Sequence, residues 1–201
     1  MSSRKRTSIN LICSFLVLGT SLCVNFVMSP YIVASIGVEA NGFVTLAENF
    51  TTYLSLVVLA LNSMAARFIS IEYNRKNYQK ANAYYNSIFW GNLILCALLM
   101  VVALFILIRL EVLIQIPAEL VPDVKLLMTF VFFSFFVVTA APNWECGVFV
   151  SNRLDRQYIP NVVTSLLRCL ILFLMFSLLT PNVWYVGFST AVITVINLLV
   201  N

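Results

Sequence analysis

The sequence contains no histidine and few charged residues, and both absences narrow the classes of protein to consider. Only 10% of the 201 residues are charged, whereas a soluble domain has about a quarter. A water-soluble fold of this size is therefore excluded. The sequence has neither a glycine-rich phosphate loop nor an acidic cluster on a loop that could bind a metal. We therefore expect no enzymatic activity, no metal and no cofactor.

Long hydrophobic runs make up most of the chain, and 61% of its residues are hydrophobic. About 20 apolar residues span a bilayer as a helix, because every backbone amide must be hydrogen-bonded within the segment. The sequence thus predicts an all-α membrane protein, a six-transmembrane-helix bundle that forms a single transmembrane domain over residues 1–201. The six predicted helices cover residues 9–29, 43–70, 83–108, 124–150, 160–179 and 184–200.

Basic residues are distributed unevenly among the segments that connect these stretches. They lie in the N-terminal tail and in the second and fourth connections, whereas the other connections are mainly acidic. Cytoplasmic loops carry an excess of Lys and Arg, so the pattern predicts a cytoplasmic N-terminus and does not indicate nucleic-acid binding. The basic residues are Arg4, Lys5, Arg6, Arg75, Lys76, Lys80, Arg153 and Arg156, and the acidic ones are Glu39, Glu111, Glu119 and Asp123.

Polar side chains within the spans are the candidates for a functional site, because ionisable groups are costly at membrane depth. At about 100° per residue, they share one face in the first, second and fifth stretches. Such faces could line a hydrated path or could join helices by hydrogen bonds, and both interpretations stay open. The carboxylate of Glu48 favours the path, because it packs less well than a hydroxyl. The path candidates are Asn25, Glu48, Thr52, Ser55, Asn62, Arg67 and Arg168, of which Arg67 lies near the cytoplasmic boundary.

Arg168 has two alternative roles. It lies about eight residues, or roughly 12 Å, from the cytoplasmic end of its span, which is too deep for complete snorkelling. Its guanidinium could bind an anionic headgroup such as a diphosphate through paired hydrogen bonds. Alternatively, it could form a structural ion pair with Glu145, which lies near the cytoplasmic end of the preceding span. The sequence slightly favours the ion pair.

Several segments resemble a known family. They are Ser29-Pro30-Tyr31-Ile32-Val33, Ile36-Gly37-Val38-Glu39-Ala40-Asn41-Gly42-Phe43, Ala60-Leu61-Asn62-Ser63-Met64-Ala65-Ala66-Arg67-Phe68-Ile69 and Ala81-Asn82-Ala83-Tyr84-Tyr85-Asn86-Ser87. In order and spacing they resemble bacterial polysaccharide and O-antigen flippases, within the multidrug/oligosaccharidyl-lipid/polysaccharide exporter superfamily. The resemblance implies a two-lobe exporter fold, of which this chain would be the N-terminal lobe. Because the last span stops at Asn201 with no tail, we expect the chain to be truncated.

The resemblance also implies a function. This chain would belong to a flippase that exports undecaprenyl-diphosphate-linked oligosaccharide across the bacterial inner membrane, in polysaccharide or lipopolysaccharide biosynthesis, by alternating access. The implied partners are the lipid-linked oligosaccharide, membrane lipids and a glycan polymerase or other assembly proteins. Two alternatives stay open. One is a cation-coupled multidrug antiporter that depends on Glu48, and the other is a non-transporting membrane scaffold in a glycan-assembly complex.

Overall fold

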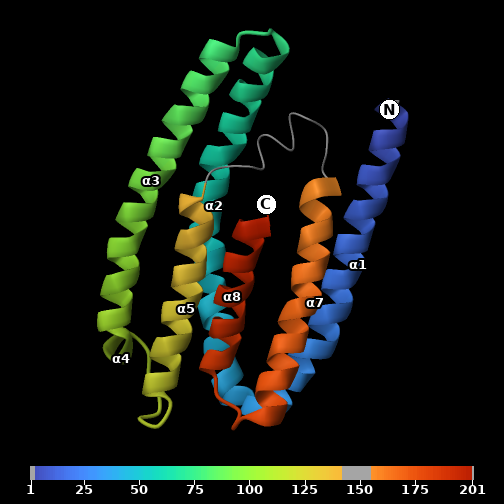
Figure 1. Ribbon diagram of the computed structural model, residues 1–201. Helices are drawn as coiled ribbons and strands as arrows, with labels where there is room; N and C mark the ends of the chain where they lie inside the picture. The colour runs from blue at the N-terminus through green and yellow to red at the C-terminus, as the bar shows by residue number, and fades with distance from the viewer. Residues whose placement is uncertain (1–2, 142–154, 201) are drawn as a thin grey trace.

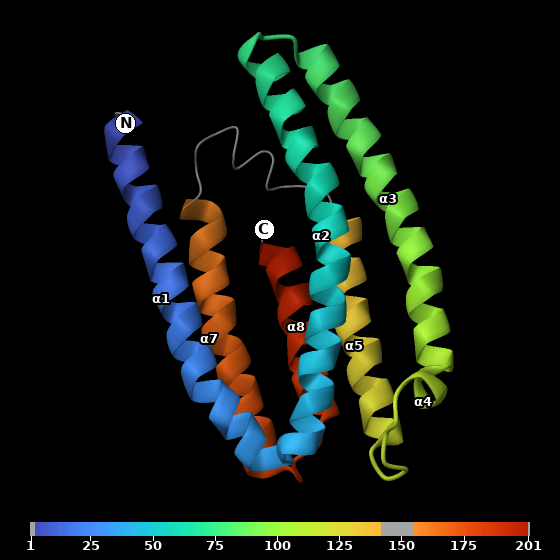
Figure 2. The ribbon, with the colours of Figure 1, turned by 180° about the vertical axis from the view of Figure 1, so that it is seen from behind.

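The computed structural model describes residues 3–141 and 155–200, with side chains for residues 11–60, 62–64, 67–141 and 160–200. This part of the chain is almost entirely α-helical and contains no strand, as the sequence predicts (Figure 1). The helices are α1 Ser3–Ile36, α2 Val38–Asn74, α3 Tyr78–Ile108, α4 Leu110–Leu113, α5 Val121–Ala140, α7 Asp155–Leu178 and α8 Trp184–Val200. Helices α1 and α7 form one side of the bundle and α2, α3 and α5 the other, with α8 between them (Figures 1 and 2).

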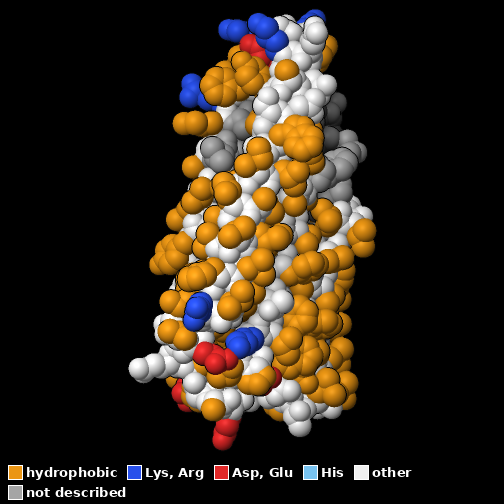
Figure 3. Space-filling view, turned by 90° about the vertical axis from the view of Figure 1, so that its left-hand side faces the viewer, with side chains coloured by type: hydrophobic (Ala, Val, Ile, Leu, Met, Phe, Trp, Pro, Cys, Tyr) orange, Lys and Arg blue, Asp and Glu red, His pale blue; other side chains and the backbone are white. Residues whose placement is uncertain are grey.

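Five of the described helices, α1, α2, α3, α5 and α7, are long and apolar enough to cross a membrane. Helix α8 is apolar but has only 17 residues, fewer than the roughly 20 that span the hydrocarbon core. The prediction of a helical membrane protein is therefore confirmed, but the prediction of six spanning helices is not. Large hydrophobic side chains such as Phe26, Ile108 and Leu178 point outward. Figure 3 shows hydrophobic side chains over the middle of the molecule and charged ones mainly near its two ends.

The connection between α1 and α2 is much shorter than the predicted segment 30–42. Helix α1 continues through Pro30 to Ile36, and α2 begins at Val38. Gly37 alone separates them, with φ 87° and ψ 163°, a backbone conformation that is essentially restricted to glycine. Its N–H still donates to the carbonyl of Val33 at 2.9 Å. Glycine therefore lets the chain reverse direction with no loop.

The connection between α2 and α3 is also short and covers residues 75–77, inside the predicted segment 71–82. Lys76 has φ 61°, the left-handed conformation that ends many helices. The Asn77 side chain accepts a hydrogen bond from the Lys80 N–H at 3.3 Å and so caps α3. Local capping therefore extends both helices beyond their predicted apolar boundaries.

The later connections follow the prediction more closely. Helix α4 and a short coil occupy most of the predicted segment 109–123, and Pro122 lies in the first turn of α5, where it requires no N–H partner. Glu111 of α4 forms an ion pair with Lys125 of α5. Helix α5 ends at Ala140, and the rest of the predicted span 124–150 lies outside the described residues, apart from Ala141. Residues 179–183 connect α7 to α8, close to the predicted 180–183.

Close packing between α5 and α8 forms the centre of the bundle. Leu127 and Met128 of α5 and Val186 of α8 are almost completely buried. Helix α1 packs mainly on α7, and α2 packs mainly on α3 and α5, so the two helices that Gly37 joins contact different neighbours. Near the Gly37 end, Tyr31 of α1 stacks on Phe173 of α7 with ring centroids 5.7 Å apart. An aromatic contact therefore joins α1 to α7 at that end.

Candidate functional site

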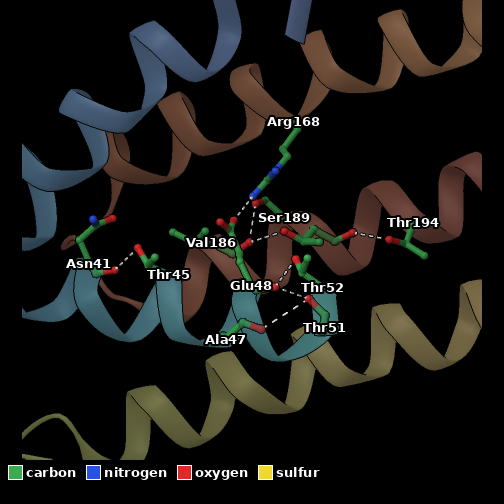
Figure 4. Close-up of polar contacts among 11 residues, drawn as sticks. Asn41, Thr45, Ala47, Glu48, Thr51, Thr52, Arg168, Val186, Ser189 and Thr194 are labelled. Carbon is green, nitrogen blue, oxygen red and sulfur yellow. Dashed lines mark hydrogen bonds and ion pairs between the residues drawn. The ribbon is translucent and has the colours of Figure 1, made fainter. Parts of the chain in front are cut away.

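Glu48 of α2 and Arg168 of α7 form an ion pair that connects these two helices. Oε1 of Glu48 lies 3.6 Å from Nη2 of Arg168. Figure 4 shows the arginine reaching from α7 toward the carboxylate on α2. Each charge lowers the cost of placing the other at membrane depth. The distance is longer than the roughly 2.8 Å of a strong charge-assisted hydrogen bond.

Arg168 has hydrogen-bonding capacity that the described residues leave unused. Its Nε atom is buried and meets no hydrogen-bond acceptor among them. A guanidinium carries several N–H donors in a rigid fork that matches the oxygens of a carboxylate or phosphate. Leaving a buried donor without a partner is costly. An anion with several oxygens would therefore be stabilised at this position.

The hydroxyl groups on α2 bond to their own helix rather than to neighbouring helices. Thr51 and Thr52 donate to the carbonyl of Glu48 at 2.9 and 2.8 Å (Figure 4). Ser55 donates to the carbonyl of Thr52 at 2.7 Å. Such bonds direct the protons of these three hydroxyls to the backbone of α2 itself. These three hydroxyls therefore do not join helices, which was one of the two interpretations of the polar stripes.

Two cavities lie against the ion pair. The first has a volume of about 280 Å³ and lies among α2, α5, α7 and α8. The second has a volume of about 310 Å³ and lies among α1, α2 and α7. Glu48 and Arg168 line both cavities, together with Val44. The ion pair therefore forms part of the wall between them, and a change in its geometry would alter both spaces.

Four of the predicted path residues line these cavities. Glu48 and Arg168 contribute to both, Ser55 to the first and Asn25 to the second. Thr52 lines neither, although its hydroxyl bonds to the carbonyl of Glu48. The structure therefore brings residues from three predicted helical faces to one place.

Two other predicted path residues lie elsewhere. Asn62 accepts a hydrogen bond from Nδ2 of Asn92 at 2.9 Å, which joins α2 to α3. This contact matches the structural interpretation of the polar stripes for Asn62. Arg67 is exposed and lines neither cavity. Glu145 lies outside the described residues, so its predicted pairing with Arg168 stays a prediction.

Sequence reasoning missed the part of the site that α8 contributes. Thr190 and Thr194 line the first cavity, and their hydroxyls donate to the carbonyls of Val186 and Thr190. Farther along, Nδ2 of Asn197 donates to Oδ1 of Asn161 at 3.4 Å and joins α8 to α7. The sequence did contain a signal for this face, because Thr190, Thr194 and Asn197 follow one another at intervals of four and three residues, which places them on one side of a helix.

The second cavity also has wall residues that the prediction did not include. Asn41 and Thr45 of α2 lie at its edge, four residues apart, and Ser29 faces them from α1. The prediction ended the first span at Ser29 and placed Asn41 in the following connection, so it did not group Asn41 with Thr45 on one helical face. Among the described residues, no three His, Cys, Asp or Glu side chains are grouped closely enough to hold a metal ion.

A bundle of apolar, membrane-length helices around a charged pair defines the class of this chain, which is a multi-pass helical membrane protein. Over 159 aligned positions, the chain is 30% identical in sequence to the "Uncharacterized membrane protein EpsK" of Bacillus subtilis (strain 168). The aligned region covers 79% of this chain and 32% of that protein, so the chain spans about a third of its relative. No protein-family model and no solved structure matches the chain.

Proposed function

We propose that this chain is one lobe of a bacterial inner-membrane exporter that moves undecaprenyl-diphosphate-linked oligosaccharide across the membrane by alternating access. The resemblance of its first three helices to polysaccharide flippases supports this proposal, as does its similarity to a membrane protein over 79% of its length. The chain's contribution would be one wall of the transport path. Arg168 would bind the diphosphate, and Glu48 would hold Arg168 when no substrate is present.

The observation that carries the proposal is the position of the Glu48–Arg168 pair between two cavities. The Nε of Arg168 is buried without a partner among the described residues, and its ion-pair contact is long, so this arginine favours an incoming anion with several oxygens. A diphosphate has such oxygens and carries more charge than the single carboxylate that it would displace. The ion pair would re-form after release, which would keep the empty path electrically neutral.

The distribution of charge supports a defined orientation for this path. The N-terminus of α1 and the basic α2–α3 connection lie at one end of the bundle, and the Gly37 and α7–α8 connections lie at the other (Figures 1 and 2). By the positive-inside rule, the first end would face the cytoplasm. The headgroup would then enter between the helices from the cytoplasmic end, while most of the lipid tail stays in the bilayer.

Replacement of Arg168 in the full-length protein, followed by measurement of surface polysaccharide, tests the proposal. We expect Arg168→Gln to reduce export at least about tenfold, because a bound diphosphate loses a charge-assisted contact. Arg168→Lys should restore part of the export, since it keeps the charge but not the fork. Arg67→Gln is the matched control, because Arg67 lies outside both cavities. Normal export by Arg168→Gln at an equal amount of protein in the membrane would refute the proposal.

A second candidate function is a cation-coupled multidrug antiporter. The Glu48 side chain is 57% exposed and its carboxylate faces both cavities, where it could take up a cation. Glu48→Gln distinguishes the two functions. An antiporter would lose drug export in this variant and would depend on an ion gradient, whereas the lipid-sugar exporter would keep Arg168 available for its substrate. A scaffold without transport activity would be unaffected by either substitution.

A further inference from the structure

The two cavities beside the ion pair differ in chemistry. In the first, the α5 wall and the start of the α8 wall are mostly apolar, and their apolar side chains are those of Leu127, Val131, Phe135, Val138 and Val186. The second has Asn25 and Ser29 of α1 facing Asn41 and Thr45 of α2. The ion pair therefore has a mainly apolar space on one side and a more polar space on the other.

The hydroxyl groups that line the first cavity do not make it polar, because they already donate their protons to backbone carbonyls of their own helices. Ser134 donates to the carbonyl of Phe130 at 2.8 Å, and Thr190 and Thr194 donate to carbonyls of α8 at 2.9 and 2.8 Å. Thr51 and Ser55 bond to α2 in the same way. What these residues offer to an occupant is mainly methyl and methylene surface. The first cavity therefore suits a small hydrocarbon group.

In the second cavity, by contrast, amide and hydroxyl groups are available. The side chains of Asn25, Ser29 and Asn41 form no hydrogen bond with another described residue, and those of Asn25 and Ser29 are exposed. Each amide offers both donors and an acceptor, which is the chemistry that hydroxyl-rich ligands require. This cavity therefore suits a sugar ring.

We propose that the two cavities bind the two sides of one diphosphate. The first isoprene unit of the lipid carrier would lie in the apolar cavity, the diphosphate on Arg168, and the first sugar in the polar cavity. This order, apolar then charged then polar, is the order of the groups in a lipid-diphosphate sugar. The inference rests on the proposed function and adds to it an orientation of the substrate and a contact with the lipid.

The volumes are consistent with this assignment. An apolar protein cavity of about 150 Å³ can hold benzene, so about 280 Å³ has room for the five carbons of an isoprene unit. A shape-matched apolar contact distinguishes ligands that differ by single methylene groups, by roughly tenfold or more. The apolar cavity would thus select isoprenoid carriers over other anionic lipids at their first carbons.

Binding of two soluble probes to the full-length protein in detergent tests the inference. The probes are dimethylallyl diphosphate, which carries one isoprene unit, and inorganic diphosphate, which carries none. We expect the wild-type protein to bind dimethylallyl diphosphate at least about tenfold more tightly. Val131→Phe fills the apolar cavity and should bring the two affinities within about twofold of each other. Ser29→Phe adds the same ring to the polar cavity and should leave the preference for dimethylallyl diphosphate intact.

Two further outcomes make the test decisive. Val138→Phe provides a second filling variant at an exposed position, in case Val131→Phe does not fold. Equal affinities in the wild-type protein, or loss of the preference in Ser29→Phe alone, would overturn the inference. Either result could occur while polysaccharide export still depends on Arg168, and the proposed function would then stand without it. If export were independent of Arg168, the proposed function itself would fail.

Discussion

Gly187 of α8 and Leu127 of α5 lie in backbone contact: a Cβ atom at position 187 would stand 2.8 Å from the Leu127 carbonyl oxygen. Real Cβ atoms do not approach a backbone oxygen so closely, so α8 would have to move away from α5. Close approach of helix backbones at small residues is a common source of stability in membrane proteins. The pairing of α5 with α8 therefore depends on the absence of a side chain at this position.

Gly187→Ala should destabilise the bundle by about 1–3 kcal/mol, because the contact would be overpacked against backbone atoms. Thermal unfolding in detergent, followed by circular dichroism, measures the effect. Gly91→Ala in α3 is the matched control, since a Cβ there meets no atom within 4 Å. The control should be neutral or slightly stabilising. A Gly187→Ala protein as stable as the control would contradict the close contact.

Gly37→Ala should cost about 1–3 kcal/mol for a different reason, because alanine at φ 87° and ψ 163° is strained whatever the space around it. Gly42→Ala, five residues farther along in α2, meets open space in a regular helix and serves as the control. The same unfolding measurement applies to both variants. Similar melting temperatures for the two would show that the α1–α2 junction can adopt another conformation.

Asn92→Leu should weaken the contact between α2 and α3. Its side chain is buried, and its hydrogen bond to Asn62 at 2.9 Å connects the two helices. Interhelical hydrogen bonds in membrane proteins contribute about 0.6–2 kcal/mol, and we expect a loss of this size in unfolding by titration with a denaturing detergent. Ser87→Ala in the same helix is the control, because the Ser87 hydroxyl bonds only to the carbonyl of Ala83 among the described residues. An unchanged Asn92→Leu midpoint would argue against the bond.

A double-mutant cycle on Glu48 and Arg168 measures their interaction directly. Because both side chains are partly exposed, at 57% and 32%, we expect a coupling free energy of only about 0.5–1 kcal/mol. Glu48→Gln and Arg168→Gln supply the single variants, and unfolding of all four proteins gives the coupling. A value near zero would mean that the two charges do not interact, and a value of several kcal/mol would mean that the pair is too strong for a ligand to separate.

Cysteine labelling tests the orientation of the helices. In a variant without the native cysteines, Lys76→Cys in the α2–α3 connection should react with a membrane-impermeant maleimide only after the cells are opened. Glu39→Cys, close to Gly37 at the other end of the bundle, should already react in intact cells, provided that the maleimide can reach the outer face of the inner membrane. Both positions are exposed at helix ends. The opposite labelling pattern would reverse the orientation expected from the positive-inside rule.

The helical membrane fold could be predicted from the sequence because hydropathy and length determine which segments can span a bilayer. The ends of the helices could not, since they depend on local capping. Polar and charged residues between Ile71 and Asn82 indicated a loop, but the Asn77 cap and the left-handed Lys76 allow the turn to be made in three residues, 75–77. Likewise, one glycine replaced the loop expected at residues 30–42.

The candidate site could be predicted only in part, because a helical period shows which residues share a face but not which helix that face meets. Glu48 and Arg168 were both identified, but the sequence did not indicate that they contact each other, because they lie 120 positions apart on helices that are not neighbours in the sequence. The same limit explains Asn62, which shares the predicted face of Glu48 but contacts α3. A helix of 37 residues meets different neighbours along its length.

The single-residue junction at Gly37 leaves no room for variation in the length of the chain. Each residue in a helix turns the chain by about 100°. Inserting or deleting one residue at the junction would therefore rotate α2 relative to α1 by about that angle, or shift α2 along its axis. Such a rotation would turn Glu48 away from Arg168 and disrupt the wall between the two cavities. Surface connections usually tolerate insertions. The junction at Gly37 instead fixes the rotation of α2 about its axis, and with it the direction in which Glu48 points relative to Arg168.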